Sequence, residues 1–135
     1  MSAHQLQWSV FMVEAAARGR GADTSRSPVL VVSRESANNA LPVVTALPLA
    51  GMKVGRRIYP NETCLPPEST GLDYPAVLLA HQIRTVPKSS LSTRTGSVDD
   101  PVLRAAVRAA VRIQLDLDAD ISDRFSMPVN LESAV

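Results

Sequence analysis

The residues with the most varied chemistry in this chain of 135 residues follow directly after a short apolar run. The run covers residues 76–80, and His81, Gln82 and Arg84 come next. A histidine exchanges protons near neutral pH, an amide donates and accepts hydrogen bonds, and a guanidinium binds phosphate or carboxylate. The pattern predicts a strand over residues 76–86 with one end in the core and these side chains at the other.

Each of these three side chains has a structural and a functional interpretation. His81 is either a general acid or base for a reacting hydroxyl, or a polar residue at the end of a strand. Gln82 either contacts a base edge or phosphate, or satisfies a backbone group. Arg84 either binds a phosphate or forms an ion pair with a buried carboxylate. Because side chains alternate along a strand, we expect Gln82 and Arg84 on the same face.

Basic residues are concentrated in the body of the chain and acidic residues near its C-terminal end. Residues 1–115 contain 13 of the 14 Lys and Arg residues and 8 of the 13 Asp and Glu residues, a net charge of +5. Residues 116–135 contain one Arg and five acidic residues, a net charge of −4. Twelve of the 14 basic residues are Arg, which favours phosphate or carboxylate recognition unless it reflects coding bias alone.

The composition disfavours several classes of protein. No apolar run approaches the roughly 18 residues that a membrane span needs, and the N-terminal residues lack the basic segment of a signal peptide. The single cysteine, Cys64, cannot form an internal disulfide, which fits a reducing compartment. We therefore expect a cytoplasmic protein without membrane contact. No Cys and His residues have metal-ligand spacing, so we expect neither a metal nor another cofactor.

The remaining segments predict short strands, loops and one long helix. Strands are expected at residues 8–14, 28–33, 41–49 and 58–65, with a turn at 36–40, loops at 15–27, 51–57 and 66–75, and a connector at 89–96. Pro48 is expected at an edge or bulge, because proline cannot donate to a ladder. This pattern predicts a mainly β, α+β fold, in which a helix packs on a small sheet or barrel.

The helix predicted at residues 99–117 is the most regular segment of the chain. Asp99 or Ser97 is its expected N-cap, followed by Pro101 in the first turn. The predicted buried stripe consists of Leu103, Val107, Ala110, Val111 and Leu115. Arginines at positions 104, 108 and 112 form a basic face that is either solvated or binds phosphates or an acidic partner. The predicted domain covers residues 1–117, and residues 118–135 form an acidic, mobile tail.

Four segments, in order, resemble the MazF/PemK family of bacterial toxin endoribonucleases. The sequence QIRTVPKSSL at residues 82–91 is similar to the family pattern Q-I-R-T-I/V-D-K-x-R-L. Residues 28–33 (PVLVVS) and 43–49 (VVTALPL) resemble the R-P-V-L-V-V-S and V-V-T-V-L-P-L strands of the family. The helix at residues 99–117 takes the place of the C-terminal helix of the family. The resemblance therefore extends from about Trp8 to Leu117.

The resemblance implies an SH3-like β-barrel with a C-terminal helix that assembles as a homodimer. It also implies metal-independent cleavage of single-stranded RNA by attack of the 2′-hydroxyl on the adjacent phosphate. The partners it implies are single-stranded RNA, an antitoxin protein of a type II toxin–antitoxin pair and, through the antitoxin complex alone, operator DNA. The candidate catalytic residues are Arg26 and His81, and the candidate RNA-binding residues are Arg20, Arg56, Arg57, Gln82 and Arg84.

The chain departs from the family at both main catalytic positions. The arginine that precedes the proline in the family is Ser27 here, with Arg26 one residue earlier, and the Thr or Ser after L-P-L is Ala50. Because a shift of one residue turns a side chain to the opposite face, Arg26 substitutes only if a bulge changes the register. The alternative is a degenerate member that binds nucleic acid or an antitoxin-like partner without cleavage. A regulatory module whose acidic tail covers its basic groove is a further alternative.

Overall fold

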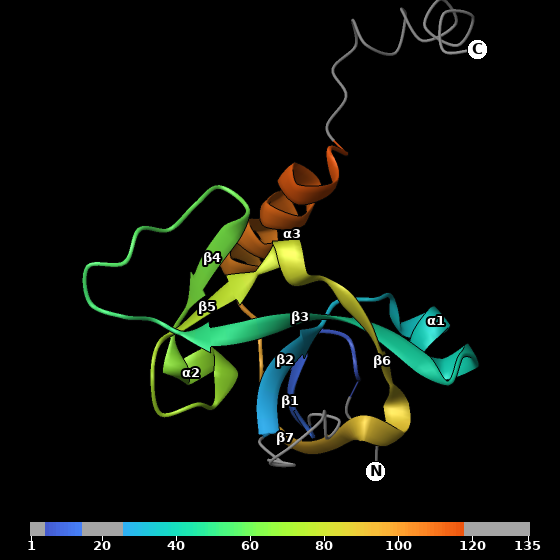
Figure 1. The fold of residues 1–135 in the computed structure, drawn as a ribbon. Coiled ribbons are helices and arrows are strands. Elements are labelled where there is room, and N and C mark those ends of the chain that lie inside the picture. The colour runs from blue at the N-terminus through green and yellow to red at the C-terminus, as the bar shows by residue number, and fades with distance from the viewer. Residues whose placement is uncertain (1–4, 15–25, 118–135) are drawn as a thin grey trace, which may run out of the picture.

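The structure is a computed structural model that describes residues 5–14 and 26–117. Seven strands form one antiparallel sheet, and the longest helix covers part of it (Figure 1). The strands are β1 (Ser9–Glu14), β2 (Arg26–Val31), β3 (Val43–Gly51), β4 (Glu62–Leu65), β5 (Ala76–Leu79), β6 (Arg84–Pro87) and β7 (Leu91–Ser97). The helices are α1 (Glu35–Ala40), α2 (Pro67–Thr70) and α3 (Pro101–Leu115), with short 3-10 helices η1 (Ala80–Gln82) and η2 (Lys88–Ser90).

Strand β3 is the centre of the sheet because it pairs with three strands, β2 on one edge and β6 and β5 on the other. Ala46 pairs with Val31 of β2 on one edge and with Arg84 of β6 on the other. Farther along β3, Leu49 pairs with Leu78 of β5, and β5 in turn pairs with β4. On the far side, β1 joins β2 to β7. Within the described residues β7 pairs with β1 alone, so the sheet curls without closing into a barrel.

Two clusters of buried apolar side chains stabilise the two faces of this curled sheet. The first cluster lies between the sheet and α3 and consists of Trp8, Val10, Leu30, Leu47, Leu49, Leu65, Ala76, Leu78, Ala80, Val98, Val107 and Ala110. The second cluster lies on the opposite face and consists of Val13, Val29, Val31, Val44, Ala46 and Val86. The alternation of β-branched and other apolar residues along β2 and β3 produces both clusters. The predicted mainly β fold with a C-terminal helix is confirmed.

The segment expected as a single strand at residues 76–86 is divided into two strands by η1. Between Leu49 and Ala46 of β3 there are three steps, whereas their partners Leu78 and Arg84 are six residues apart. The 3-10 helix η1 contains the extra residues and is closed by a hydrogen bond from the Ile83 amide to the Ala80 carbonyl (3.2 Å). The prediction of one continuous strand was therefore wrong at its most polar part.

Helix α3 covers Pro101–Leu115 instead of the predicted residues 99–117, and its N-cap is Asp100. The Asp100 carboxylate accepts a hydrogen bond from the Val102 amide (2.8 Å), while Ser97 donates to Asp99 instead of capping the helix. Val107 and Ala110 of the predicted stripe are buried, and Leu103 and Val111 pack against the first cluster. Leu115 is 46% exposed, because α3 extends past the edge of the sheet.

Two arginines of the predicted basic face contact an aromatic ring. The guanidinium carbons of Arg104 and Arg108 each lie 5.1 Å from the centroid of the Trp8 ring. Arg104 also donates to the Val98 carbonyl (2.7 Å) and forms an ion pair with Asp99 (3.3 Å). Cation–π contacts of this kind attach α3 to the start of β1. The face is therefore partly structural and not simply solvated.

Three further segments differ from the sequence-based expectation. The turn predicted at residues 36–40 is helix α1, because the Glu35 carboxylate accepts the Leu6 and Gln7 amides (both 2.9 Å) and buried Asn38 bonds to Ser33. The connector predicted at residues 89–96 contains β7, and the loop at 66–75 contains α2. Pro48 lies in β3 between its last β6 pair and its first β5 pair, where one edge of the strand has no partner.

Candidate functional site

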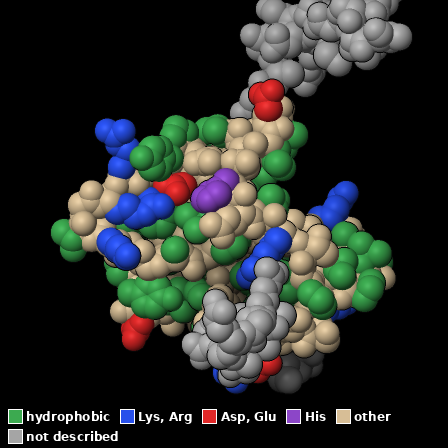
Figure 2. Space-filling view, viewed as in Figure 1, with side chains coloured by type: hydrophobic (Ala, Val, Ile, Leu, Met, Phe, Trp, Pro, Cys, Tyr) green, Lys and Arg blue, Asp and Glu red, His purple; other side chains and the backbone are tan. Residues whose placement is uncertain are grey.

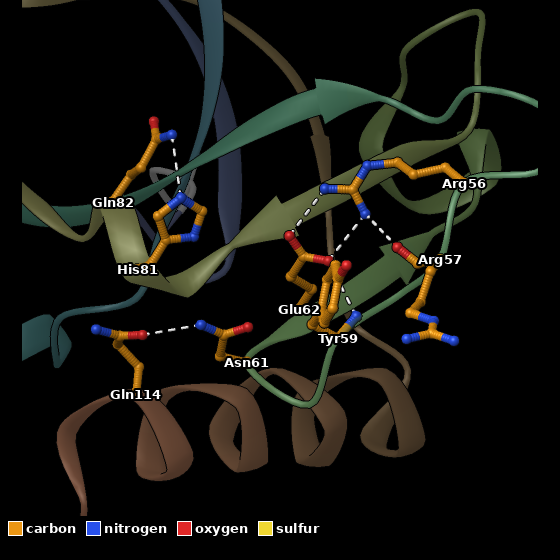
Figure 3. A network of polar contacts seen from close by, with 8 residues as sticks. All are labelled: Arg56, Arg57, Tyr59, Asn61, Glu62, His81, Gln82 and Gln114. Carbon is orange, nitrogen blue, oxygen red and sulfur yellow. Dashed lines mark hydrogen bonds and ion pairs between the residues drawn. The ribbon is translucent and has the colours of Figure 1, made fainter.

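The η1 turn places His81 and Gln82 outside the ladder, where both side chains are exposed. The side-chain nitrogen of Gln82 lies 3.3 Å from Nε2 of His81, so the amide can donate to the ring (Figure 3). Arg84 follows as the first residue of β6 and is also exposed. Gln82 and Arg84 are both exposed, although they do not alternate along one strand as we had expected.

A buried carboxylate next to this turn belongs to Glu62 of β4. Its two oxygens accept hydrogen bonds from both terminal nitrogens of Arg56, each 2.8 Å long (Figure 3). The Glu62 side chain is 5% exposed, whereas that of Arg56 is 29% exposed. The sequence made Arg56 a candidate RNA-binding residue and left Arg84 either to bind a phosphate or to pair with a buried carboxylate. Among the described residues Arg84 has no ion pair, and Arg56 holds the carboxylate instead.

The Arg56 guanidinium holds the pKa of Glu62 at about 2, below its ordinary value of 4.5. Burial of the carboxyl group opposes this shift, while a hydrogen bond from the Tyr59 amide and the charge of His81 add to it. Glu62 is therefore ionised at neutral pH and cannot act as a general acid there. The role of Glu62 is to hold Arg56 and the loop before β4 in place.

Strand alternation places Glu62 on the side of the sheet away from α3. The Thr63 hydroxyl donates to the Ala106 carbonyl of α3 (3.2 Å), so the residues on either side of Thr63 point to the opposite face. Cys64 pairs with Val77, and Val77 pairs with Ala50, so Ala50 shares the face of Glu62. We call this surface the η1 face: Ala50, Glu62, His81 and Gln82. Figure 2 shows the histidine there beside an acidic side chain and a group of basic ones.

Ser27 of β2 and Ala50 of β3 lie beyond the paired part of these two strands. The β2–β3 pairing runs from Val31–Ala46 to Val29–Pro48 and ends there. Both residues are partly buried. Position 27 therefore has no guanidinium and position 50 has no hydroxyl, in contrast to what the resemblance implies.

Arg26 does not replace Ser27 through a bulge. The β1–β2 pairing keeps one register from Val10–Leu30 to Glu14–Arg26, with no shift in between. Arg26 is exposed and, by alternation, its side chain leaves the strand on the face opposite to that of Ser27. The condition that sequence reasoning set for a catalytic Arg26 is therefore not met within the described residues. Arg20 and the acidic tail lie outside them.

Sequence reasoning missed two features of this region. Asn61 donates to the side-chain oxygen of Gln114 in α3 (2.9 Å), which connects the loop before β4 to the helix. Tyr59 is exposed beside the Arg56–Glu62 pair.

The part of the chain that the structure describes has no group of three or more His, Cys, Asp or Glu side chains able to hold a metal ion. None of its helices has the length and apolar character required to cross a membrane.

The fold is that of toxins of known structure. An endoribonuclease from a Mycobacterial species in complex with its cognate antitoxin superimposes with a TM-score of 0.67, at 24% identity over 84% of this chain and 97% of the other. The Mycobacterium tuberculosis toxin MazF-mt6 superimposes with a TM-score of 0.65, at 22% identity over 82% of this chain and 99% of the toxin. The MazE-MazF structure (Form-III) from Deinococcus radiodurans superimposes with a TM-score of 0.64, at 22% identity over 82% of this chain and 94% of the matched chain. These likenesses establish the architecture.

Family membership follows from the sequence itself. Residues 6–115 match the model of the family described as PemK-like, MazF-like toxin of type II toxin-antitoxin system. Because the match covers most of the chain, this protein belongs to that toxin family, and the resemblance drawn from the four segments is confirmed. No curated protein matches the chain.

Proposed function

We propose that this protein is a cytoplasmic toxin that cleaves single-stranded RNA without a metal ion and is neutralised by an antitoxin protein. The observation that carries the proposal is the exposure of His81 and Gln82 by η1, in a chain that belongs to the toxin family. The net charge of +5 on residues 1–115 supports a polyanionic substrate. The proposed assembly is a homodimer that binds operator DNA only through its antitoxin.

In the proposed reaction the ribose 2′-oxygen forms a bond to the adjacent phosphorus and the bond from phosphorus to the 5′-oxygen breaks. One imidazole nitrogen of His81 accepts the proton of the 2′-hydroxyl while water protonates the leaving 5′-oxygen, or the protonated ring donates to the 5′-oxygen while water accepts the 2′ proton. Arg84, exposed at the start of β6, binds the phosphate whose charge increases in the transition state. The products are a 2′,3′-cyclic phosphate and a 5′-hydroxyl.

The absence of a guanidinium at position 27 and of a hydroxyl at position 50 lowers the expected rate. Removing one donor from such a site costs about 10²–10³ in rate, and Ala50 has no hydroxyl to offer. His81 and Arg84 therefore supply more of the chemistry in this proposal than their equivalents would in a site with both family side chains. The expected enzyme is slow and needs single-turnover measurements at high protein concentration.

The test is incubation of the purified protein with mixed-sequence single-stranded RNA in the presence of EDTA. Fragments that end in 2′,3′-cyclic phosphate support the proposal, and 2′-O-methyl RNA of the same sequence should remain intact. His81→Gln should remove most of the cleavage, which distinguishes the protein from a contaminating ribonuclease. If the wild-type protein cleaves no RNA at any concentration, the proposed activity is wrong, although the fold is unaffected.

A second candidate function is binding of RNA or of an antitoxin-like partner without cleavage. The observation that favours it is that Ser27 and Ala50 stand where the resemblance implies an arginine and a threonine or serine. Under this alternative the double substitution Ser27→Arg and Ala50→Thr generates ribonuclease activity or toxicity that the unmodified protein lacks. Toxicity of the unmodified protein on expression would rule the alternative out.

A further inference from the structure

The loop between β3 and β4, residues 52–61, extends outward from the end of the sheet (Figure 1). It carries Tyr59, which is 52% exposed and is the only exposed aromatic side chain among the described residues. Arg57, two positions earlier, is also exposed, and its side chain points away from the Arg56–Glu62 pair (Figure 3). An exposed ring next to an exposed guanidinium on a projecting loop is available to a ligand, because neither side chain is buried in a core.

Several hydrogen bonds hold the loop in one conformation. The Tyr59 amide donates to Glu62 (3.0 Å) and the Glu62 amide donates to the Tyr59 carbonyl (2.9 Å), so both backbone groups of Tyr59 are fixed. The Arg56 guanidinium, bound to Glu62, also donates to the Arg57 carbonyl (2.7 Å). Near the tip, Gly55 has φ +78°, a conformation that favours glycine. The backbone that presents Tyr59 and Arg57 is therefore ordered before any ligand arrives.

Aromatic rings on ordered surfaces beside cationic groups bind single-stranded nucleic acid. Bases stack on the ring regardless of sequence, and nearby Arg or Lys binds the backbone phosphate. Two residues of extended chain span at most about 7 Å, so one nucleotide can contact both Tyr59 and Arg57. The neighbouring Lys53 is exposed as well. Glu62 does not repel a phosphate strongly here, because Arg56 neutralises it.

We propose that Tyr59 stacks against a base of single-stranded RNA, that Arg57 binds the adjacent phosphate, and that the Arg56–Glu62 pair is a positioning device for both. The inference rests on the proposed function, since it assigns part of the same substrate to this loop. It changes the role of Arg56 from an RNA contact to a residue that acts through the loop backbone. It also places RNA contacts on both sides of Glu62, with His81 beyond it on η1.

The experiment measures binding of a short, fluorescently labelled 2′-O-methyl RNA of mixed sequence, which has no free 2′-hydroxyl and stays intact. Tyr59→Leu should weaken binding by about 5- to 150-fold with an unchanged salt dependence, because it removes stacking and no charge. Tyr59→Phe should bind like the wild-type protein. Arg57→Gln should lower the slope of log affinity against log salt by about 0.7, which marks one lost phosphate contact.

The Glu62→Gln variant shows whether Glu62 affects RNA binding by positioning the loop or by its negative charge. The substitution removes a negative charge and releases Arg56, so electrostatics alone predicts tighter RNA binding. Loss of positioning predicts weaker binding, with little further loss when Tyr59→Leu is added. Glu68→Gln, which removes the same charge at an exposed residue of α2, is the matched control and should not weaken binding. Circular dichroism establishes that each variant is folded.

The outcomes separate this inference from the proposed function. Wild-type affinity in Tyr59→Leu, or tighter binding in Glu62→Gln, overturns the inference whether or not the protein cleaves RNA. A wild-type protein that does not bind the oligonucleotide overturns it together with the RNA-directed function. If the protein binds with the expected Tyr59 and Glu62 dependence but leaves ordinary RNA intact, the inference is supported and only the cleavage activity is rejected.

Discussion

Glu62 and Arg56 are joined by two hydrogen bonds of 2.8 Å that connect a buried position of β4 to the tip of the loop before it. The carboxylate comes from the sheet and the guanidinium from a chain segment that has no strand neighbour. Such a bidentate pair fixes orientation as well as distance. The loop geometry therefore depends on the ionisation of a single side chain.

The first prediction is an acid-dependent loss of stability that requires Glu62. Its pKa is about 2 in the folded protein and 4.5 is the ordinary value, so unfolding takes up a proton below about pH 4.5. The stabilisation is complete above pH 4.5 and is lost as the pH falls through 2. Urea unfolding at several pH values should show this decline. Glu62→Gln should reduce the decline and cost about 1–3 kcal/mol at pH 7.

Glu35 provides the internal comparison for this measurement. Burial raises its pKa, but hydrogen bonds from the Gln7 and Leu6 amides and from Asn38, together with the charge of Lys88, bring the pKa below its ordinary value. Glu35 therefore contributes stability in the same direction, and part of the pH dependence should remain in Glu62→Gln. An unchanged pH dependence in that variant would contradict the assignment to Glu62.

The second prediction concerns catalysis on the η1 face. His81→Gln should reduce the single-turnover rate of RNA cleavage by about 10²–10⁴, because proton transfer by a positioned side chain contributes that much. Gln82→Ala is the matched control: its side chain neighbours the ring but has no titratable group, so it should affect binding more than rate. Equal losses of rate in the two variants would argue for a structural role of the turn and against proton transfer by His81.

The third prediction concerns the contact between Trp8 and Arg108. Arg108→Gln should destabilise the protein by about 0.5–1 kcal/mol through loss of the cation–π contact. The loss should be absent when Trp8 is first changed to Leu, which removes the ring but keeps an apolar side chain. Circular dichroism during urea unfolding of the four proteins in this cycle measures the coupling. Additive effects of the two substitutions would show that the ring and the guanidinium do not interact.

The fourth prediction tests the start of α3. Asp100→Ala should cost about 0.5–2 kcal/mol, because it removes the acceptor for the Val102 amide. Asp100→Asn should retain most of the stability, since asparagine is as good an N-cap. Asp99→Ala should cost less, because its partners Ser97 and Arg104 are surface contacts. Thermal unfolding of the three variants gives the order, and a larger loss in Asp99→Ala would reverse the assignment.

Periodicity was sufficient to predict most of the strands and α3, because their stabilisation comes from apolar side chains that repeat along the sequence. It was insufficient where one long-range polar contact decides the conformation. The Glu35 carboxylate accepts hydrogen bonds from the amides of Gln7 and Leu6, which lie 28 and 29 positions earlier in the sequence. These contacts stabilise helix α1, where the Asn-rich sequence predicted a turn. Strand β7 was missed because Ser92, Thr93 and Thr95 lack an apolar period, and its pairing with β1 alone defines it.

At the candidate site, residue types were predictable but partners were not. The exposed positions of His81, Gln82 and Arg84 agree with the sequence-based expectation. The ionic partner of Glu62 depends on how the loop at residues 52–61 folds back, which no local pattern encodes. For the same reason Arg56 appeared to be a substrate contact. The register of β1 with β2 could not be predicted either, although it decides on which face Arg26 lies.

Strand β3 has a consequence for how the protein unfolds. Val44 and Ala46 belong to the second cluster, while Leu47 and Leu49 belong to the first, so one strand is common to both hydrophobic clusters. Unfolding of β3 therefore exposes side chains of both clusters together. We therefore expect the amide protons of β2, β3 and β5 to exchange with solvent through one common opening event, and thermal melting to be a single cooperative transition.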